Sequence, residues 1–124
     1  MTTKILIADD EPNILISLEF LMKREGYEVL LARDGQEALD LLREARPRLV
    51  LLDVMMPRKT GFEVCQEVRN DDELRATLIL MLTAKGRETD IVKGLALGAN
   101  AYMTKPFSTR ELVQKVREML EAAP

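Results

Sequence analysis

Five residues of this sequence carry side chains suited to phosphoryl chemistry: Asp9, Asp10, Asp53, Thr83 and Lys105. Three carboxylates within a few ångströms would repel one another, and without a cation at least one would be driven towards its protonated form. A bound metal ion removes that conflict. Because the oxygen ligands come without thiolate or imidazole, they favour Mg²⁺, with Mn²⁺ possible, and leave positions for water and phosphate oxygens.

Asp53 follows the most apolar segment of the chain, Leu49–Leu52, where a carboxylate is costly unless it has a partner or a chemical role. A carboxylate can act as a nucleophile toward phosphorus, which gives an aspartyl phosphate. The transfer needs mainly positioning and neutralisation of charge, which Mg²⁺, the Lys105 ammonium and the Thr83 hydroxyl could supply.

Each of these residues taken singly has an ordinary explanation. An aspartate such as Asp10, placed before Glu11 and Pro12, commonly forms a turn or caps a helix. An isolated threonine or lysine is commonly a solvated surface residue. The functional interpretation therefore depends on the fold bringing all five residues to one place.

Short apolar segments rich in Leu, Ile and Val alternate along the chain with helical patterns. These segments do not alternate between apolar and polar residues, which predicts strands buried on both faces of a parallel sheet. The predicted strands are Lys4–Ala8, Glu28–Ala32, Leu49–Leu52, Leu78–Leu82 and Ala101–Met103. Five βα units predict right-handed crossovers and a doubly wound α/β sheet.

Start and stop signals mark the helices between these strands. Pro12 suits the first turn of the first helix, which we expect to end near Gly26. The fourth helix is expected from Gly86 to Leu97, with Gly98 as its stop. Capping-box patterns mark the other three starts, at Asp34 with Glu37, Thr60 with Glu63, and Ser108 with Glu111.

In a doubly wound sheet, ligands bind outside the carboxyl ends of the strands. The residues that follow the first, third, fourth and fifth predicted strands are, in order, Asp9 with Asp10, Asp53, Thr83, and Lys105. The topology therefore predicts that three aspartates, a hydroxyl and a lysine converge at one edge of the sheet.

Composition excludes several classes of function. The 124 residues suit one domain, spanning 1–124, and contain no histidine, which excludes Ser-His-Asp catalysis, imidazole-bound zinc and a phosphohistidine of the chain's own. A net charge of −3 provides neither a nucleic-acid-binding face nor a polybasic membrane patch. The lone Cys65 is expected to be a core residue, and the absence of a long apolar segment favours a cytoplasmic protein.

The segments ILIADDEP, LVLLDVMMP, LMLTA and YMTKPF occur in this order along nearly the whole chain. In sequence and separation they resemble the receiver domains of two-component response regulators, including the chemotaxis regulators. That resemblance implies a flavodoxin-like (βα)5 fold: a five-stranded parallel sheet of order 2-1-3-4-5 with five helices.

The resemblance also assigns expected roles around the metal. Asp53 matches the phosphoacceptor, Asp10 a direct metal ligand, and Asp9 an acid that acts through metal-bound water. The backbone carbonyl of Met55 matches a further metal ligand, and Lys105 matches the cation that contacts the phosphoryl oxygens.

A further set of residues matches the family's switch. Thr83 corresponds to the hydroxyl that engages the phosphoryl group, and Tyr102 to the aromatic that rotates inward with it, although Tyr102 could equally be a half-buried edge residue. In the family the bond before Pro106 is usually cis, which would aim Lys105.

The resemblance implies a signalling switch and not a true enzyme, although the domain would assist its own phosphotransfer and its slow autodephosphorylation. A histidine kinase or a phosphotransfer protein would supply the phosphoryl group. The fourth helix, fifth strand and fifth helix would then pass the signal to an output domain or target protein. Because Ala101 replaces an aspartate common in regulators that dimerise through this face, we expect a monomer or a weak phosphorylation-linked dimer.

Met55 is a departure with a chemical consequence, because it offers no acid or amide to orient an attacking water, so the aspartyl phosphate should be relatively long-lived. The pair Met55–Met56 could serve loop packing or an exposed contact. Two other functions stay open: a receiver fold used without phosphorylation, and a Mg²⁺-dependent aspartyl phosphohydrolase of the haloacid dehalogenase type. The second is disfavoured because Met55 occupies the position of its general acid.

Overall fold

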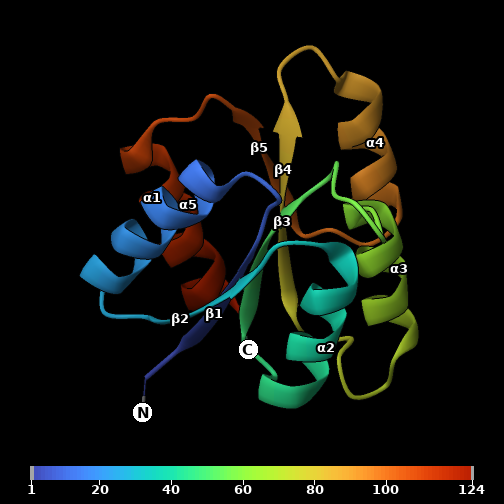
Figure 1. Ribbon diagram of the computed structural model, residues 1–124, viewed down its shortest axis with the longest axis horizontal. Helices are drawn as coiled ribbons and strands as arrows, with labels where there is room; N and C mark the ends of the chain where they lie inside the picture. The colour runs from blue at the N-terminus through green and yellow to red at the C-terminus, as the bar shows by residue number, and fades with distance from the viewer. Residues whose placement is uncertain (1, 124) are drawn as a thin grey trace.

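The computed structural model describes residues 2–123 and shows one five-stranded sheet (Figure 1). All four pairings between neighbouring strands are parallel, and the strand order is β2-β1-β3-β4-β5, which confirms the expected doubly wound topology. The strands are β1 (Lys4–Ala8), β2 (Glu28–Ala32), β3 (Leu49–Asp53), β4 (Leu78–Ala84) and β5 (Ala101–Lys105). The helices are α1 (Pro12–Arg24), α2 (Gly35–Ala45), α3 (Gly61–Asn70), α4 (Glu88–Ala96) and α5 (Thr109–Ala122).

The helices form a layer on each side of the sheet. In Figure 1, α1 and α5 lie on one side and α2, α3 and α4 on the other. Successive residues of β1 point to opposite faces, so Ile5 and Ile7 pack towards α1 and α5, while Leu6 and Ala8 pack towards α2 and α3. All five residues of β3 are buried, which explains its unbroken apolar sequence. Within the described residues, no helix is long and apolar enough to cross a membrane.

Side-chain caps fix three of the helix starts. Thr60 and Glu63 form the complete capping box expected at α3. Asp34 accepts the Glu37 backbone N–H at 2.8 Å, but the Glu37 carboxylate accepts the N–H of Arg33, one residue before the cap, so the reciprocal half of the predicted box is displaced. The Ser108 hydroxyl accepts the Glu111 N–H at the start of α5.

Three strands run further than their apolar segments predicted. β3 includes Asp53, β4 includes Thr83, and β5 includes Lys105, because the parallel ladder continues past the last apolar residue. The sequence placed these groups after the strands, whereas all three are paired within them: Asp53 and Lys105 are the last residues of β3 and β5, and Thr83 is the second-last residue of β4. Extended backbone therefore holds the candidate site residues more firmly than a loop would.

The fourth helix is shorter than predicted. α4 begins at Glu88 and not at Gly86, which has a φ of +84° and cannot continue a right-handed helix. At the other end α4 stops as expected, with Gly98 at a φ of +112°.

The start of α3 lies directly against the end of β3. The Gly61 N–H donates to the Val54 carbonyl at 2.8 Å, and a Cβ at Gly61 would lie 2.3 Å from the Asp53 carbonyl oxygen. Only a residue without a side chain can occupy this position without moving backbone. Gly61 therefore sets how closely α3 approaches the end of β3.

We predict that Gly61→Ala lowers the free energy of unfolding by about 3 kcal/mol, the upper part of the range typical of forced backbone displacement in a packed region. The neighbouring Thr60→Ala, which removes the α3 cap and nothing else, should cost about 1 kcal/mol. Urea unfolding followed by circular dichroism measures both values. Equal losses in the two variants would contradict a steric role for Gly61.

Candidate functional site

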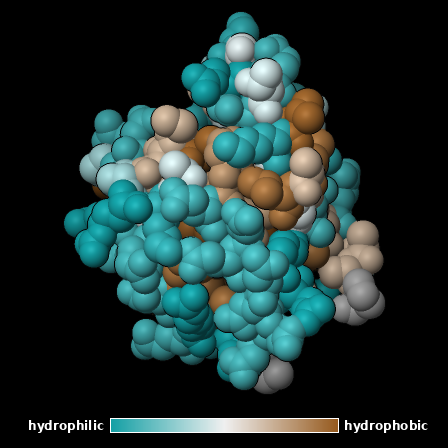
Figure 2. Space-filling view, turned by 90° about the vertical axis from the view of Figure 1, so that its right-hand side faces the viewer, coloured by the Kyte–Doolittle hydropathy of each residue, from teal (hydrophilic) through white to brown (hydrophobic). Residues whose placement is uncertain are grey.

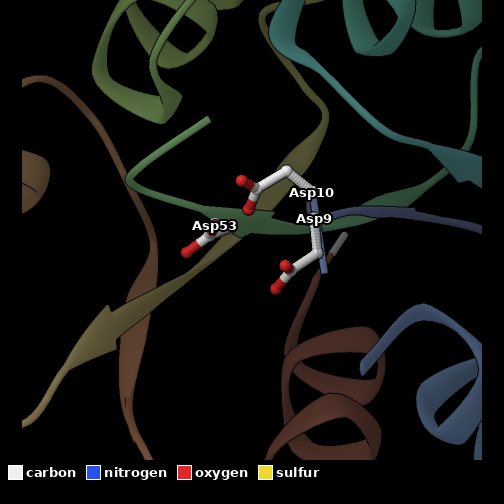
Figure 3. Close-up of side chains that lie close together, drawn as sticks. All are labelled: Asp9, Asp10 and Asp53. Carbon is white, nitrogen blue, oxygen red and sulfur yellow. The ribbon is translucent and has the colours of Figure 1, made fainter. Parts of the chain in front are cut away.

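The three aspartates converge at the carboxyl edge of the sheet, as the topology predicted. Asp9 and Asp10 follow β1, and Asp53 ends β3, which is paired to β1 (Figure 3). Each offers a carboxylate oxygen, and these oxygens lie within 4.8 Å of one another. Asp9 and Asp53 are buried, whereas Asp10 is exposed at the mouth of the cluster. The arrangement has the donor chemistry of a hard-cation site.

Lys105 joins the cluster from the end of β5, the outermost strand on one side of the sheet. Its Nζ donates to Asp9 Oδ2 at 2.8 Å and to Asp53 Oδ1 at 3.3 Å, and lies 3.8 Å from Glu11 Oε1. Asp9 is fully buried and also accepts the Glu11 backbone N–H at 2.9 Å, which fixes its carboxylate. The ammonium thus lies between the two buried carboxylates and partly offsets their repulsion.

The burial of Asp53 changes its acid–base behaviour. Desolvation by burial, with the charge of Asp9 as the next cause, raises the pKa of Asp53 to about 6, although Lys105 acts in the opposite direction. For Lys105, burial acts to lower the pKa, but the hydrogen bond to Asp9 and the charges of Asp53 and Asp9 outweigh it, so the pKa is raised. The expectation that one clustered carboxyl shifts towards its protonated form is confirmed in direction.

Thr83 reaches the same edge but its hydroxyl is turned aside. It is fully buried, and its Oγ1 donates to the Met103 carbonyl oxygen of β5 at 3.4 Å, a long hydrogen bond. The structure therefore brings four predicted residues into one cluster and places the fifth beside it, facing the neighbouring strand.

The remaining predicted residues surround this cluster. Met55 is 61% exposed and Met56 is buried, which resolves the pair into one exposed and one packing residue. Tyr102 is 42% exposed on β5. The Lys105–Pro106 peptide bond is cis, as expected. Cys65 is fully buried in α3, which confirms it as a core residue.

Two participants were not identified from the sequence. Glu11 lies 3.8 Å from Lys105 and was not among the predicted site residues, although its place directly after two candidate ligands was a usable signal. Gly61 shapes the Asp53 backbone through a contact made in three dimensions, for which the sequence carries no signal beyond a glycine at the start of a helix.

The family model for the response regulator receiver domain matches residues 5–117. The chain belongs to this family. Two solved structures are similar over nearly their whole length and that of this chain. A protein of Chloroflexus aurantiacus described as a response regulator is 36% identical with a TM-score of 0.93, covering 98% of this chain and 99% of that one. A chemotaxis response regulator of Vibrio cholerae is 35% identical with a TM-score of 0.89, covering 95% and 98%.

A third similar structure is the receiver domain of a signal transduction histidine kinase from Syntrophus aciditrophicus, 31% identical with a TM-score of 0.90, covering 97% of this chain and 91% of that one. Receiver domains are signalling switches of two-component systems, in which phosphorylation on an aspartate is typical of the family. They bind Mg²⁺ at an acidic pocket and interact with histidine kinases and output domains. The cluster of Asp9, Asp10 and Asp53 in this receiver domain is an acidic pocket of that chemistry.

The raised pKa of Asp53 predicts a pH-dependent cost to folding. Because the folded domain retains the Asp53 proton up to a pH of about 6 and the unfolded chain releases it near its ordinary value of 3.8, stability falls as pH rises through this interval. In metal-free buffer at pH 7.5, Asp53→Asn should therefore raise the free energy of unfolding by about 2 kcal/mol. At pH 3.5 the gain should vanish.

Urea unfolding with EDTA at the two pH values measures the effect. Glu44→Gln, which removes an exposed carboxylate on α2, serves as the matched control and should change stability little at either pH. A gain in Asp53→Asn that is the same at both pH values would show that it does not arise from titration.

Proposed function

We propose that Asp53 accepts a phosphoryl group from the phosphohistidine of a partner kinase or phosphotransfer protein, in a reaction that requires Mg²⁺. The observation that carries this proposal is the Lys105 ammonium held between Asp9 and Asp53, beside three carboxylate oxygens within 4.8 Å of one another. Because the chain contains no histidine, the donor belongs to another protein or domain. We also propose that residues 1–124 form a single receiver domain and that this domain is located in the cytoplasm.

The residues of the chain have distinct roles in this transfer. An Asp53 carboxylate oxygen attacks phosphorus, the new O–P bond forms, and the N–P bond to the donor imidazole breaks. With a pKa of about 6, Asp53 is largely ionised at neutral pH and so available as the nucleophile. Lys105 contacts the transferred oxygens, and Asp9 keeps its ammonium in place.

Asp10, Asp53 and the Met55 backbone carbonyl would hold Mg²⁺, with Asp9 contributing through water. The exposure of Asp10 supports this assignment, because a metal that keeps several water ligands needs an open side. When bound, the ion neutralises charge on the carboxylates and on the phosphoryl oxygens. Mn²⁺, with the same preference for oxygen ligands, is expected to substitute.

The conformational switch is proposed to begin at Thr83. Its hydroxyl makes only a long hydrogen bond to the Met103 carbonyl, so a charged phosphoryl oxygen would compete for it effectively. Movement of Thr83 would vacate space beside β5 into which Tyr102, now 42% exposed, can turn. Lys105, which precedes Pro106, completes the contact with the phosphoryl group.

The proposed output surface is formed by α4, β5 and α5. Figure 2 shows apolar surface gathered over α4, where Val92 is 68% and Leu95 43% exposed. A groove next to it is lined by Leu95, Tyr102 and Phe107 together with the charged Arg110 and Lys115. A mixed apolar and charged surface suits a protein partner, either an output domain or a separate target. We further propose that the domain is a monomer or forms a weak dimer through this same face when it is phosphorylated.

Incubation with acetyl phosphate and Mg²⁺ should add one phosphoryl group, and mass spectrometry of the labelled peptide should place it on Asp53. EDTA should abolish labelling, and Lys105→Ala should reduce the rate by about 10²-fold or more, the effect of removing one preorganised charge from a transfer site. Label that persists in Asp53→Ala would overturn the assignment. Absence of label with a cognate kinase as well would favour a receiver fold used without phosphorylation.

Met55→Asn should shorten the lifetime of the aspartyl phosphate by roughly 2- to 10-fold, which corresponds to one added hydrogen bond to the attacking water. Because the side chain is 61% exposed, this change should leave the fold intact. Decay of acid-labile ³²P label after removal of the donor measures the lifetime. Met55→Leu is the matched control and should match the parent, whereas an unchanged lifetime in Met55→Asn would contradict the role of this position.

A further inference from the structure

One arginine of α3 ties together three segments at the edge of the sheet opposite the acidic pocket. Arg69 Nε donates to the Gly98 carbonyl at 2.9 Å, and its NH1 group donates to the carbonyls of Arg75 at 2.9 Å and Thr77 at 2.7 Å. Its NH2 group donates to Asn100 Oδ1 at 2.8 Å. All three nitrogens of the guanidinium are therefore engaged, although the side chain is only half-buried.

These bonds anchor the carboxyl-terminal end of α4. The N–H groups of Gly98 and Ala99 bond back to Leu95 and Gly94, which is the Schellman arrangement with glycine at the left-handed position. A Cβ at Gly98 would lie 2.8 Å from the Arg69 Cγ, so the glycine is also required for the close approach of the arginine.

The same junction is joined to the sheet and to the core. The backbone N–H of Asn100 donates to the Ile79 carbonyl oxygen, and the backbone N–H of Ile79 donates to Asn100 Oδ1. The same Oδ1 atom accepts the hydrogen bond from Arg69. The Cys65 thiol lies 3.6 Å from the Leu97 carbonyl. Residues 97–100, here called the α4–β5 junction, are thus held by α3 and β4 together.

The amino-terminal end of α4 is held far less. Among residues 2–123, no side chain caps this end. The six residues 84–89, which run from the end of β4 into the first turn of α4, are all exposed. The side-chain ion pair found there is local and joins Arg87, the residue just before the helix, to Asp90 in its first turn. This free end directly follows Thr83, the proposed switch residue. The two ends of α4 are therefore unequally fixed.

We propose that Arg69 is the positioning residue that makes the α4–β5 junction the fixed end of α4, so that the helix moves about this point when Thr83 is drawn towards a phosphoryl group. The junction then converts a small displacement of the 84–89 segment into a rotation of the face that carries Val92 and Leu95. This proposal rests on the proposed function for its trigger, but the anchoring itself does not.

Hydrogen–deuterium exchange with mass spectrometry tests the anchor, with Mg²⁺ and beryllium fluoride as the stand-in for the phosphoryl group. In the parent protein, beryllium fluoride should change exchange in peptides covering 84–92 and leave the junction at 97–100 unchanged. In unliganded Arg69→Met, junction amides should exchange about tenfold faster than in the parent, because their hydrogen bonds open more readily once the anchor is lost. Beryllium fluoride should then alter exchange along the whole of α4.

Arg75→Met is the matched control, since it removes an equal charge nearby from a side chain that, among residues 2–123, forms an ion pair with Asp72 and no other acidic residue. It should leave junction exchange as in the parent. Peptides from β1 and β3 report global stability, and an Arg69→Met effect of equal size there would reduce Arg69 to a general structural role and overturn the proposal. Equal junction exchange in the two variants, or a beryllium fluoride response largest at 97–100 in the parent, would also overturn it.

A second variant acts in the opposite direction and avoids loss of folding. Asn100→Asp keeps the acceptor oxygen and gives Arg69 a charged partner, so junction exchange should slow by roughly 2- to 10-fold. Faster exchange in this variant would contradict the anchor. If beryllium fluoride has no effect on any peptide of the parent, the proposed phosphoryl site is wrong. The comparison of unliganded parent with unliganded Arg69→Met still tests whether Arg69 anchors the junction.

Discussion

The placement of one ammonium group between two buried carboxylates is the interaction on which this domain depends. Lys105 comes from β5, an outermost strand of the sheet, and reaches Asp9, which follows β1, and Asp53, which ends β3. No local sequence relation links residues 96 positions apart, as Lys105 and Asp9 are. The contact exists because parallel strands all present their carboxyl ends at the same end of the sheet.

This arrangement leaves more negative than positive charge beside the apolar core. Three carboxylates face one ammonium, and burial together with the charge of Asp9 raises the pKa of Asp53 although Lys105 acts to lower it. The fully buried β3 strand, from Leu49 to Asp53, supplies the rigid support for a group that would otherwise be expelled to solvent. A site of this kind gains stability by taking up positive charge and changes its balance when it takes up a phosphoryl group, which is the physical basis of a switch.

The two ends of the strands differ in how firmly the segments around them are held. At the carboxyl edge, Asp10, Met55 and the 84–89 segment are exposed and available to a partner. At the opposite edge, Arg69 of α3 and Asn100 form hydrogen bonds that join α3 to the α4–β5 junction, to the segment just before β4 and to β4 itself. A helix such as α4, which spans from one edge to the other, therefore has one end near the chemistry and the other in the rigid part of the fold.

The sequence by itself predicted the order of the elements and most of the residues that meet at the candidate site. Unbroken apolar segments such as Leu49–Leu52 encode buried parallel strands, and the rule that such strands share a carboxyl edge was sufficient to select the three aspartates, Thr83 and Lys105. Only the tertiary structure decided where the strands end, because the ladder continues past the last predicted apolar residue to Asp53, Ala84 and Lys105. It also decided that the Thr83 hydroxyl faces Met103 and that Arg69 anchors Gly98, since hydrogen bonds between distant segments leave no periodic trace in a sequence.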